Sequence, residues 1–188
     1  MTAPSAAVQR ATGALTAYLT DAAIPWEPGG RPGEHVLTLP GERKLRVVAS
    51  VLVRDPMTSI SAFVVRNPDE NHQAVYRYLL RRNLRLPMLA YAVDSSGDVY
   101  VKGDVPTAAV EAGYLDRLMG ALLHAADDPF NELLALGFLE SMKREWAWRV
   151  DRGESLANLE AFRPLLEGSE LTHGLGDGAD VEGRPVQE

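Results

Sequence analysis

Apolar positions recur at helical spacing near the start of the chain. Their separations of three, four and seven residues are typical of an amphipathic helix. These positions are Val8, Leu15, Leu19 and Ala22. The pattern predicts a helix over residues 5–23 that ends before Pro25, because proline interrupts a helix. Residues 27–33 are rich in glycine and proline, so they predict a loop.

Three runs with the residue types of β-strands follow this loop. They cover residues 35–39, 45–54 and 59–66. Pro40-Gly41 and Asp55-Pro56 separate the runs, and both dipeptides favour turns. In the third run every second residue from Ile60 to Val64 is aliphatic, as in a strand with one buried face. The simplest interpretation is a three-stranded antiparallel meander.

A helix is predicted from Asn67-Pro68-Asp69 to about Asn83. Asp69 and Glu70 are expected in its first turn, where the helix dipole favours negative charge. Residues 86–94 and 98–102 then predict a hairpin around a Ser-Ser-Gly turn.

Beyond Pro106 the sequence predicts helices alone. Their ranges are 107–126, 130–150 and 155–166. Gly153 is expected to cap the second of these helices. The predicted order is αβββαββα with two extra C-terminal helices. This order defines an α+β fold, a twisted antiparallel sheet of about five strands with helices packed on it.

The length of 188 residues predicts a single domain, residues 1–166, with a helical extension from about residue 130. Residues 167–188 are rich in glycine and acids and have few large apolar side chains, so we expect them to be disordered. This segment contains six acids and one arginine, and it therefore carries most of the net charge of −7. Such acidity disfavours a nucleic-acid partner, because DNA and RNA binding depends on cationic side chains.

The sequence contains no cysteine. Disulfides, thiolate nucleophiles and cysteine-based zinc sites are thereby excluded, which fits a reducing cytoplasm. The first residues lack the charged and then apolar pattern of a signal peptide. Apolar stretches are interrupted well before the ~18–20 residues that a membrane span needs. We therefore expect a soluble cytoplasmic protein with no membrane partner.

Histidines and acids are the remaining candidates for catalysis or metal binding. None of the four histidines stands three or four residues from another, so no helix offers a paired ligand face. His124 precedes Asp127 and Asp128, but capping of a helix that starts near Phe130 explains these acids more simply than a metal site does. The sequence has no Gly-x-Ser-x-Gly motif and no phosphate-binding glycine loop. We expect no catalytic residue, no metal and no cofactor.

Two alternatives to a non-catalytic protein stay open. Asp69, Glu70 and His72 are close enough in sequence for the acid–base chemistry of a hydrolase-like enzyme. Neighbouring carboxylates at a helix start point in different directions, however, and helix capping accounts for them. A small-molecule-sensing or DNA-linked regulator is the other alternative.

Four arginines gather near the end of the helix predicted up to Asn83. They are Arg77, Arg81, Arg82 and Arg85. Arg77 and Arg81 share one helix face, which fits a patch for an anion or an acidic peptide. A solvated helix face with cations near its C-terminal end accounts for the same pattern and is the simpler interpretation.

Apolar and aromatic residues of the last two predicted helices have no assigned partner. A helix as short as 155–166 is not stable alone in water, so its apolar face must pack against something. It packs either on its own domain, or on a second copy or a client protein in the helix-in-groove manner. The candidate interface residues are Trp146, Trp148, Leu159, Phe162 and Leu166.

Several stretches together resemble a known family. They cover residues 61–71, 76–83, 90–94, 97–100 and 145–149. The sequence resembles a YbjN-domain protein of the actinobacterial type, in a group of bacterial sensory transduction regulators. The similarity extends over roughly residues 10–166. Its most specific part is the Arg-Asn-Pro-Asp-Glu-Asn segment from Arg66 to Asn71.

This resemblance implies a fold like that of type III secretion chaperones, which are commonly homodimers that hold a partner protein in extended form. It implies a regulatory or chaperone-like role without catalysis. We therefore expect a cytoplasmic protein-binding module that forms a homodimer and binds another protein.

The exposed polar segment at the start of a helix is the expected partner-binding site, because free backbone amides there can receive an anion. The candidate residues are Arg66, Asn67, Asp69, Glu70, Asn71, Arg77 and Arg81. A purely structural role for this segment, as a turn and a helix cap, is the alternative.

Overall fold

The computed structural model describes residues 3–166. The chain divides into two compact units, Met1–Glu140 and a second unit that begins at Ser141. The predicted disordered segment, residues 167–188, lies outside the described residues. No helix among the residues that the structure describes is both long and apolar enough to span a membrane.

The first unit is built on one antiparallel sheet in the order β1-β2-β3-β4-β6-β5. The strands are β1 (Trp26–Pro28), β2 (Glu34–Pro40), β3 (Arg46–Leu52), β4 (Met57–Val65), β5 (Ala90–Val93) and β6 (Val99–Pro106). The predicted α+β class and antiparallel sheet are confirmed, but the sheet has six strands where about five were expected.

The additional strand, β1, falls where the sequence predicted a loop. Trp26 is paired with Leu37, and Pro28 with His35. The Trp26 ring also packs against the His35 ring at a centroid distance of 5.0 Å. Pairing with β2 stabilises this three-residue strand. Because its partners lie further along the sequence, no pattern within the three residues themselves predicts the strand.

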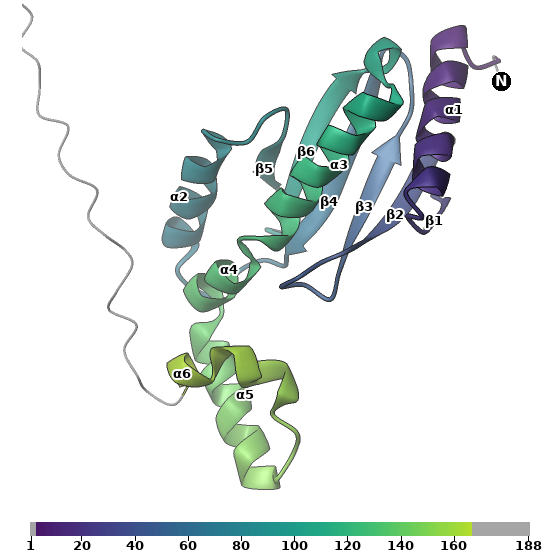
Figure 1. Ribbon diagram of the computed structural model, residues 1–188. Helices are drawn as coiled ribbons and strands as arrows, with labels where there is room; N and C mark the ends of the chain where they lie inside the picture. Colours follow the sequence, from purple (N-terminus) through teal and green to yellow (C-terminus); the bar gives the residue numbers. More distant parts are fainter. Residues whose placement is uncertain (1–2, 167–188) are drawn as a thin grey trace, which may run out of the picture. The chain divides into compact units, whose positions relative to one another are not determined.

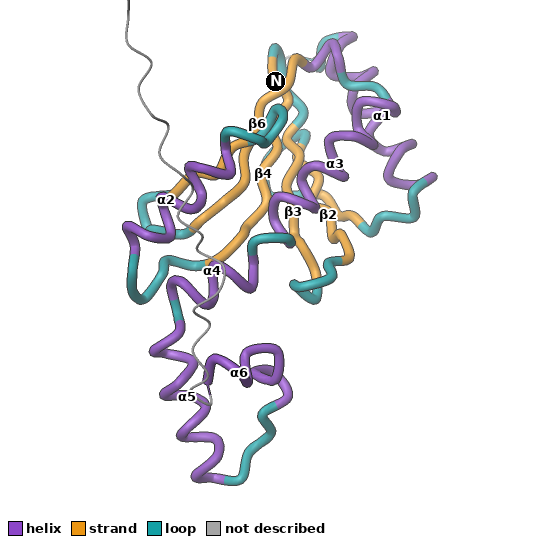
Figure 2. The backbone as a smooth tube through the Cα atoms, turned by 60° about the vertical axis from the view of Figure 1, so that its left-hand side comes forward, coloured by secondary structure: helices purple, strands orange, loops and turns teal. Residues whose placement is uncertain are grey.

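The helices of the first unit lie on one face of the sheet, where α1 and α3 run side by side (Figures 1 and 2). They are α1 (Ala6–Asp21), α2 (His72–Asn83), the 3₁₀ turn η1 (Thr107–Ala109), α3 (Ala112–Asp127) and α4 (Phe130–Gly137). Ser5 caps α1, since its hydroxyl accepts a hydrogen bond from the Val8 amide at 3.2 Å.

Buried and more exposed residues alternate along β2, β3 and β4. Because successive side chains of a strand point to opposite faces, one face of the sheet is buried and the other is open. The buried face and the helices form one core, to which α1 contributes Leu15 and Leu19, α2 Val75 and α3 Leu122.

The predicted helices beyond Pro106 are divided further than expected. The helix predicted over 107–126 is interrupted between η1 and α3, and the helix over 130–150 breaks at Phe138, where φ is −143°. The break has a tertiary cause, because the carbonyl of the preceding Gly137 accepts hydrogen bonds from the amides of Asp69 and Glu70.

The second unit continues from α5 (Leu139–Arg152) into the 3₁₀ helix η2 (Ala157–Phe162) and the short α6 (Arg163–Leu166). Gly153 has a φ of +65°, and its amide donates to the carbonyl of Val150 at 3.2 Å. The predicted glycine cap is therefore confirmed. The single helix predicted over 155–166 is wrong, because half of that range is 3₁₀ and only its last four residues are α-helical.

Candidate functional site

Residues 66–72 form a polar corner between β4 and α2. The guanidinium of Arg66 makes two hydrogen bonds to the carboxylate of Asp69, one of them at 2.7 Å from Nη2 to Oδ2. It also lies over the ring of Phe138, with 4.5 Å between Cζ and the ring centroid. Arg66 therefore connects the end of β4 to the junction between α4 and α5.

Asn67 links the polar corner to the β5–β6 hairpin. The backbone amide of Asn67 donates to Oδ1 of Asp98 at 2.8 Å, and its side-chain oxygen lies 3.2 Å from Nε2 of His72. The hairpin approaches so closely that a Cβ atom at position 97 would lie 2.4 Å from Cγ of Asn67. Gly97, with a φ of +87°, is thus required both by its backbone conformation and by this contact.

The α2 helix begins at His72, with Asn71 as its left-handed N-cap residue. Asp69 and Glu70 consequently precede the helix, and the prediction that they occupy its first turn is wrong. The Asn71 side chain donates to the carbonyl of Leu136 at 3.1 Å. Glu70 accepts the amide of Glu140 at 2.8 Å. These bonds hold the start of α2 against the end of α4 and the first residues of α5.

The structure thus brings five predicted site residues together in the polar corner. They are Arg66, Asn67, Asp69, Glu70 and Asn71. All five make contacts within the chain that serve the fold, and partner binding by them stays a prediction. Arg77 and Arg81 lie elsewhere, on the exposed side of α2.

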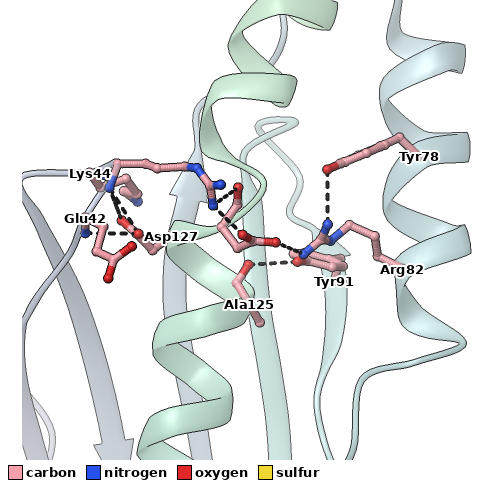
Figure 3. Close-up of polar contacts among 9 residues, drawn as sticks. Glu42, Lys44, Tyr78, Arg82, Tyr91, Ala125 and Asp127 are labelled. Carbon is pink, nitrogen blue, oxygen red and sulfur yellow. Dashed lines mark hydrogen bonds and ion pairs between the residues drawn. The ribbon is translucent and has the colours of Figure 1, made fainter. Parts of the chain in front are cut away.

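A second polar cluster, absent from the sequence prediction, surrounds Asp127 at the end of α3 (Figure 3). Asp127 is buried, and its carboxylate accepts the backbone amides of Glu42 at 3.0 Å, Arg43 at 3.1 Å and Lys44 at 2.7 Å. A Cβ on Gly41 would lie 2.2 Å from the carbonyl oxygen of Lys44. The β2–β3 turn is thus wound tightly around one carboxylate.

Burial raises the pKa of Asp127, but the three backbone amides outweigh it and hold the pKa below its ordinary value. Asp127 is therefore ionised at neutral pH. The predicted role of Asp127 or Asp128 as the cap of α4 is wrong, because α4 follows Pro129 with no side-chain cap.

Asp128 joins two arginines from different elements. Its carboxylate pairs with Nη1 of Arg43 and, at 2.6 Å, with Nη2 of Arg82. Arg82 also donates to the hydroxyl of Tyr78 at 3.2 Å, while Tyr91 donates its hydroxyl proton to the carbonyl of Ala125 at 2.7 Å (Figure 3). The cluster therefore joins α2, α3, β5 and the β2–β3 turn.

Lys44 extends this cluster toward the open face of the sheet. Its ammonium donates to the carbonyls of Phe63 at 2.8 Å and Val64 at 2.9 Å. It also lies 5.3 Å from the ring centroid of Phe63 and 5.5 Å from that of Phe130. Burial lowers the pKa of Lys44 to about 8, and nearby Asp127 opposes this shift.

The two groups of acids and histidines considered for catalysis are both occupied by structural contacts. Asp69 and Glu70 bind within the polar corner, and Asp127 and Asp128 hold the β2–β3 turn and two arginines. Within residues 3–166 the structure groups no three acids or histidines in a way that could hold a metal ion.

The predicted interface residues of the second unit differ in exposure. Leu159 and Phe162 are buried, Trp146 and Leu166 are half-buried, and 47% of Trp148 is exposed. Two arginines cover the indoles: Arg163 lies over Trp146 at 5.4 Å and Arg152 over Trp148 at 4.6 Å. A role of these residues in association stays a prediction.

Solved structures with a similar fold define the structural class. A chain in the structure of the HopA1–SchA chaperone–effector complex is 13% identical, and the match covers 69% of this chain and 99% of that chain with a TM-score of 0.52. A chain in the crystal structure of the ExsC–ExsE complex is 17% identical, with coverages of 67% and 95% and a TM-score of 0.50. The fold is that of type III secretion chaperones.

Sequence comparison identifies the family. The model of the YbjN family, described as "Putative bacterial sensory transduction regulator", matches residues 13–135. An uncharacterized protein of Mycobacterium tuberculosis (strain ATCC 25618 / H37Rv) is 49% identical over 138 residues, 73% of this chain and 75% of the relative. An uncharacterized protein of Mycobacterium leprae is 45% identical over 150 residues, with coverages of 80% and 79%. The chain belongs to the YbjN family, as the resemblance had indicated.

Proposed function

We propose that this chain is a non-catalytic, cytoplasmic protein-binding module, a chaperone-like or regulatory adaptor that works as a homodimer. The similarity in fold to a chain from a chaperone–effector complex supports the class of activity. The family description as a sensory transduction regulator agrees with a role exercised through another macromolecule.

The observation that carries the proposal is the open face of the sheet. The open-face row comprises Thr38, Val48, Phe63, Tyr100 and Ala92. The register of the sheet pairs Thr38 with Val48, Phe63 with Tyr100 and Tyr100 with Ala92. Ala49 lies opposite Ala62, so Val48 comes beside Phe63 in the neighbouring strand.

This row combines exposed apolar surface with rigid geometry. Val48 is 44% exposed and Phe63 is 38% exposed, and the rings of Phe63 and Tyr100 meet edge to face at 5.6 Å. Aromatic side chains of low conformational entropy on a fixed sheet are efficient anchors for a protein partner. The next row across β3 and β4 contains Ser50 and Ser61, which supply hydrogen-bonding groups beside the apolar anchors.

In the proposed binding surface, the polar corner forms a charged rim beside the open-face row. Arg66 follows β4, the strand that carries Phe63, and its side chain is 57% exposed. A partner carboxylate that approaches Arg66 would compete with Asp69 for the same guanidinium. The exposed indole of Trp148 is the candidate for contact between two copies of the chain.

The carboxylates considered for catalysis are engaged in structural contacts, which favours this function over the hydrolase-like alternative. A general base needs a lone pair that is free to take a proton from a substrate. The carboxylate of Asp69 binds Arg66, and that of Glu70 accepts the amide of Glu140. In the second group of acids, the carboxylate of Asp127 accepts three amides, and that of Asp128 binds two arginines. The described contacts thus give these groups a role in holding the turn and the helices.

A capture experiment with matched variants tests the proposal. The tagged chain and its Val48→Ser/Phe63→Ser variant are used to recover partners from the cytosol of the native host. Leu45→Ser is the control, because Leu45 is 94% exposed but lies in the β2–β3 turn outside the open-face row. We expect one recurrent protein with the wild type and with Leu45→Ser, and its loss with the double variant. Equal recovery by all three would refute a binding role for the open face.

A further inference from the structure

The outward side of α2 presents an apolar and basic surface. This α2 face is formed by Gln73, Tyr76, Arg77, Leu80, Arg81 and Leu84. The exposed fraction is 65% for Leu80 and 87% for Leu84, which is unusual for leucines that adjoin each other on one helix face. These residues belong to α2 and, with Leu84, to its C-cap, so the surface is an open strip along one helix and no enclosed cavity.

The charge of the α2 face is also unbalanced. The helix contains three arginines and no acidic residue. Arg82 turns inward to Asp128, whereas Arg77 and Arg81 have no ion pair among the described residues. An occupant of this strip therefore has to supply carboxylates to the two arginines and apolar side chains to the two leucines.

The chain itself contains a segment with this composition. Residues 167–188 carry six carboxylates and one arginine, a net charge of −5. Apolar side chains are interspersed among these acids at Leu171, Leu175, Val181 and Val186. The segment therefore matches the α2 face in both charge and apolar content.

The segment is long enough to reach α2 however the second unit is placed. Its 22 residues span up to ~75 Å when extended. A unit of about 140 residues has a radius of gyration of only ~14 Å, and the α2 face is ~17 Å long at 1.5 Å per residue. Covalent attachment moreover gives the segment an effective concentration of roughly millimolar.

We propose that residues 167–188 dock along the α2 face of the same chain. The carboxylates pair with Arg77 and Arg81, and the apolar residues of the segment cover Leu80 and Leu84. The docked segment shields the strip from nonspecific association and competes with any acidic partner for it. This inference goes beyond the proposed function and does not rest on it, because the open-face row lies on β-strands.

Paramagnetic relaxation in the full chain tests this docking. The sequence has no cysteine, so Ala179→Cys provides a single site for a spin label within the acidic segment. We expect selective loss of amide signal from residues 73–84, with little loss at exposed amides of α1. The loss should diminish as salt rises from 0.05 to about 1 M, because screening shortens the range of surface charges.

Charge reversal separates docking from mere proximity. In Arg77→Glu/Arg81→Glu the signal loss at residues 73–84 should fall to the level seen at α1. The control Arg10→Glu/Arg117→Glu reverses two exposed arginines of α1 and α3 and should leave the loss unchanged. Reversal of Asp177, Asp180 and Glu182 to arginine should restore docking in the α2 variant.

Two results would overturn the inference. One is that the wild type shows no signal loss at residues 73–84, or that Arg77→Glu/Arg81→Glu leaves this loss unchanged. The other is equal loss when a spin-labelled chain without ¹⁵N is mixed with an unlabelled ¹⁵N chain, since the occupant would then be a second copy. Neither result bears on partner capture by the open face.

Discussion

Asp127→Ala removes the acceptor around which the β2–β3 turn is built. The carboxylate binds the amides of Glu42, Arg43 and Lys44 at 3.0, 3.1 and 2.7 Å. No side-chain atom of alanine can replace it. The three amides are therefore left without their acceptor in a partly buried place.

The size of the effect follows from these three bonds. A typical hydrogen bond contributes about 1 kcal/mol net, and a hydrogen bond to a charged group contributes more. The expected loss is about 3 kcal/mol in the free energy of unfolding. For a unit of about 140 residues this corresponds to a fall in Tm of about 10 °C. Asp127→Asn keeps one oxygen acceptor and should lose about half as much.

Chemical and thermal denaturation of the full chain measure this loss. Asp116→Ala is the matched control, because Asp116 is exposed on the same helix and accepts one long bond of 3.4 Å from Tyr18. The control should change the free energy by less than ~0.5 kcal/mol. A loss for Asp127→Ala that equals the control would refute the conclusion that this carboxylate holds the turn.

The pH dependence gives an independent check on the same residue. The amides lower the pKa of Asp127 in the folded state below its ordinary value. Its stabilisation is therefore complete above the unfolded pKa of about 3.9 and is lost as the pH falls through the lower folded pKa. The difference in stability between wild type and Asp127→Ala should be constant from pH 7 to about pH 5 and shrink below about pH 4.

Three further predictions concern the rest of the first unit. Gly97→Ala should destabilise the fold by about 1–3 kcal/mol in thermal denaturation, because φ is +87° and a Cβ would meet the Asn67 side chain. Asn83→Leu should cause concentration-dependent association, detectable by light scattering. The side-chain oxygen of Asn83 accepts the backbone amide of Tyr91 at 2.7 Å and so covers the edge of β5, which the variant would leave open for another chain. An unchanged scattering mass would contradict this. Relative to Lys44→Met, the wild type should gain thermal stability as the pH rises from 8 to 10. The reason is that Lys44 loses its proton near pH 8 in the folded state but at about pH 10.4 in the unfolded chain. If the Tm of both proteins changed with pH in the same way, the lowered pKa would be contradicted.

Local patterns were sufficient to predict most of the fold. Alternating residues predicted β4, the apolar spacing predicted α1, and Gly153 ended α5 as expected. Each of these features depends on neighbours within a few residues. The β-strand Trp26–Pro28 has no such signal, because its pairing with β2 alone makes it a strand.

The polar clusters could not be predicted, because their contacts join distant parts of the sequence. Asp127 binds residues 83–85 positions away, and nothing near Gly41 indicates its partner. Asp69 and Glu70 were expected inside a helix because acids favour a first turn. The carbonyl of Gly137 binds both of their amides instead, and this tertiary contact delays the helix to His72.

In our proposal, this member of the YbjN family functions by binding another protein. The most direct measurement is light scattering on the wild-type chain after affinity capture from the cytosol of its native host. We expect one recurrent partner at fixed stoichiometry, in a complex whose mass includes two copies of the chain. Elution of the chain alone as a monomer, without a reproducible partner, would contradict it.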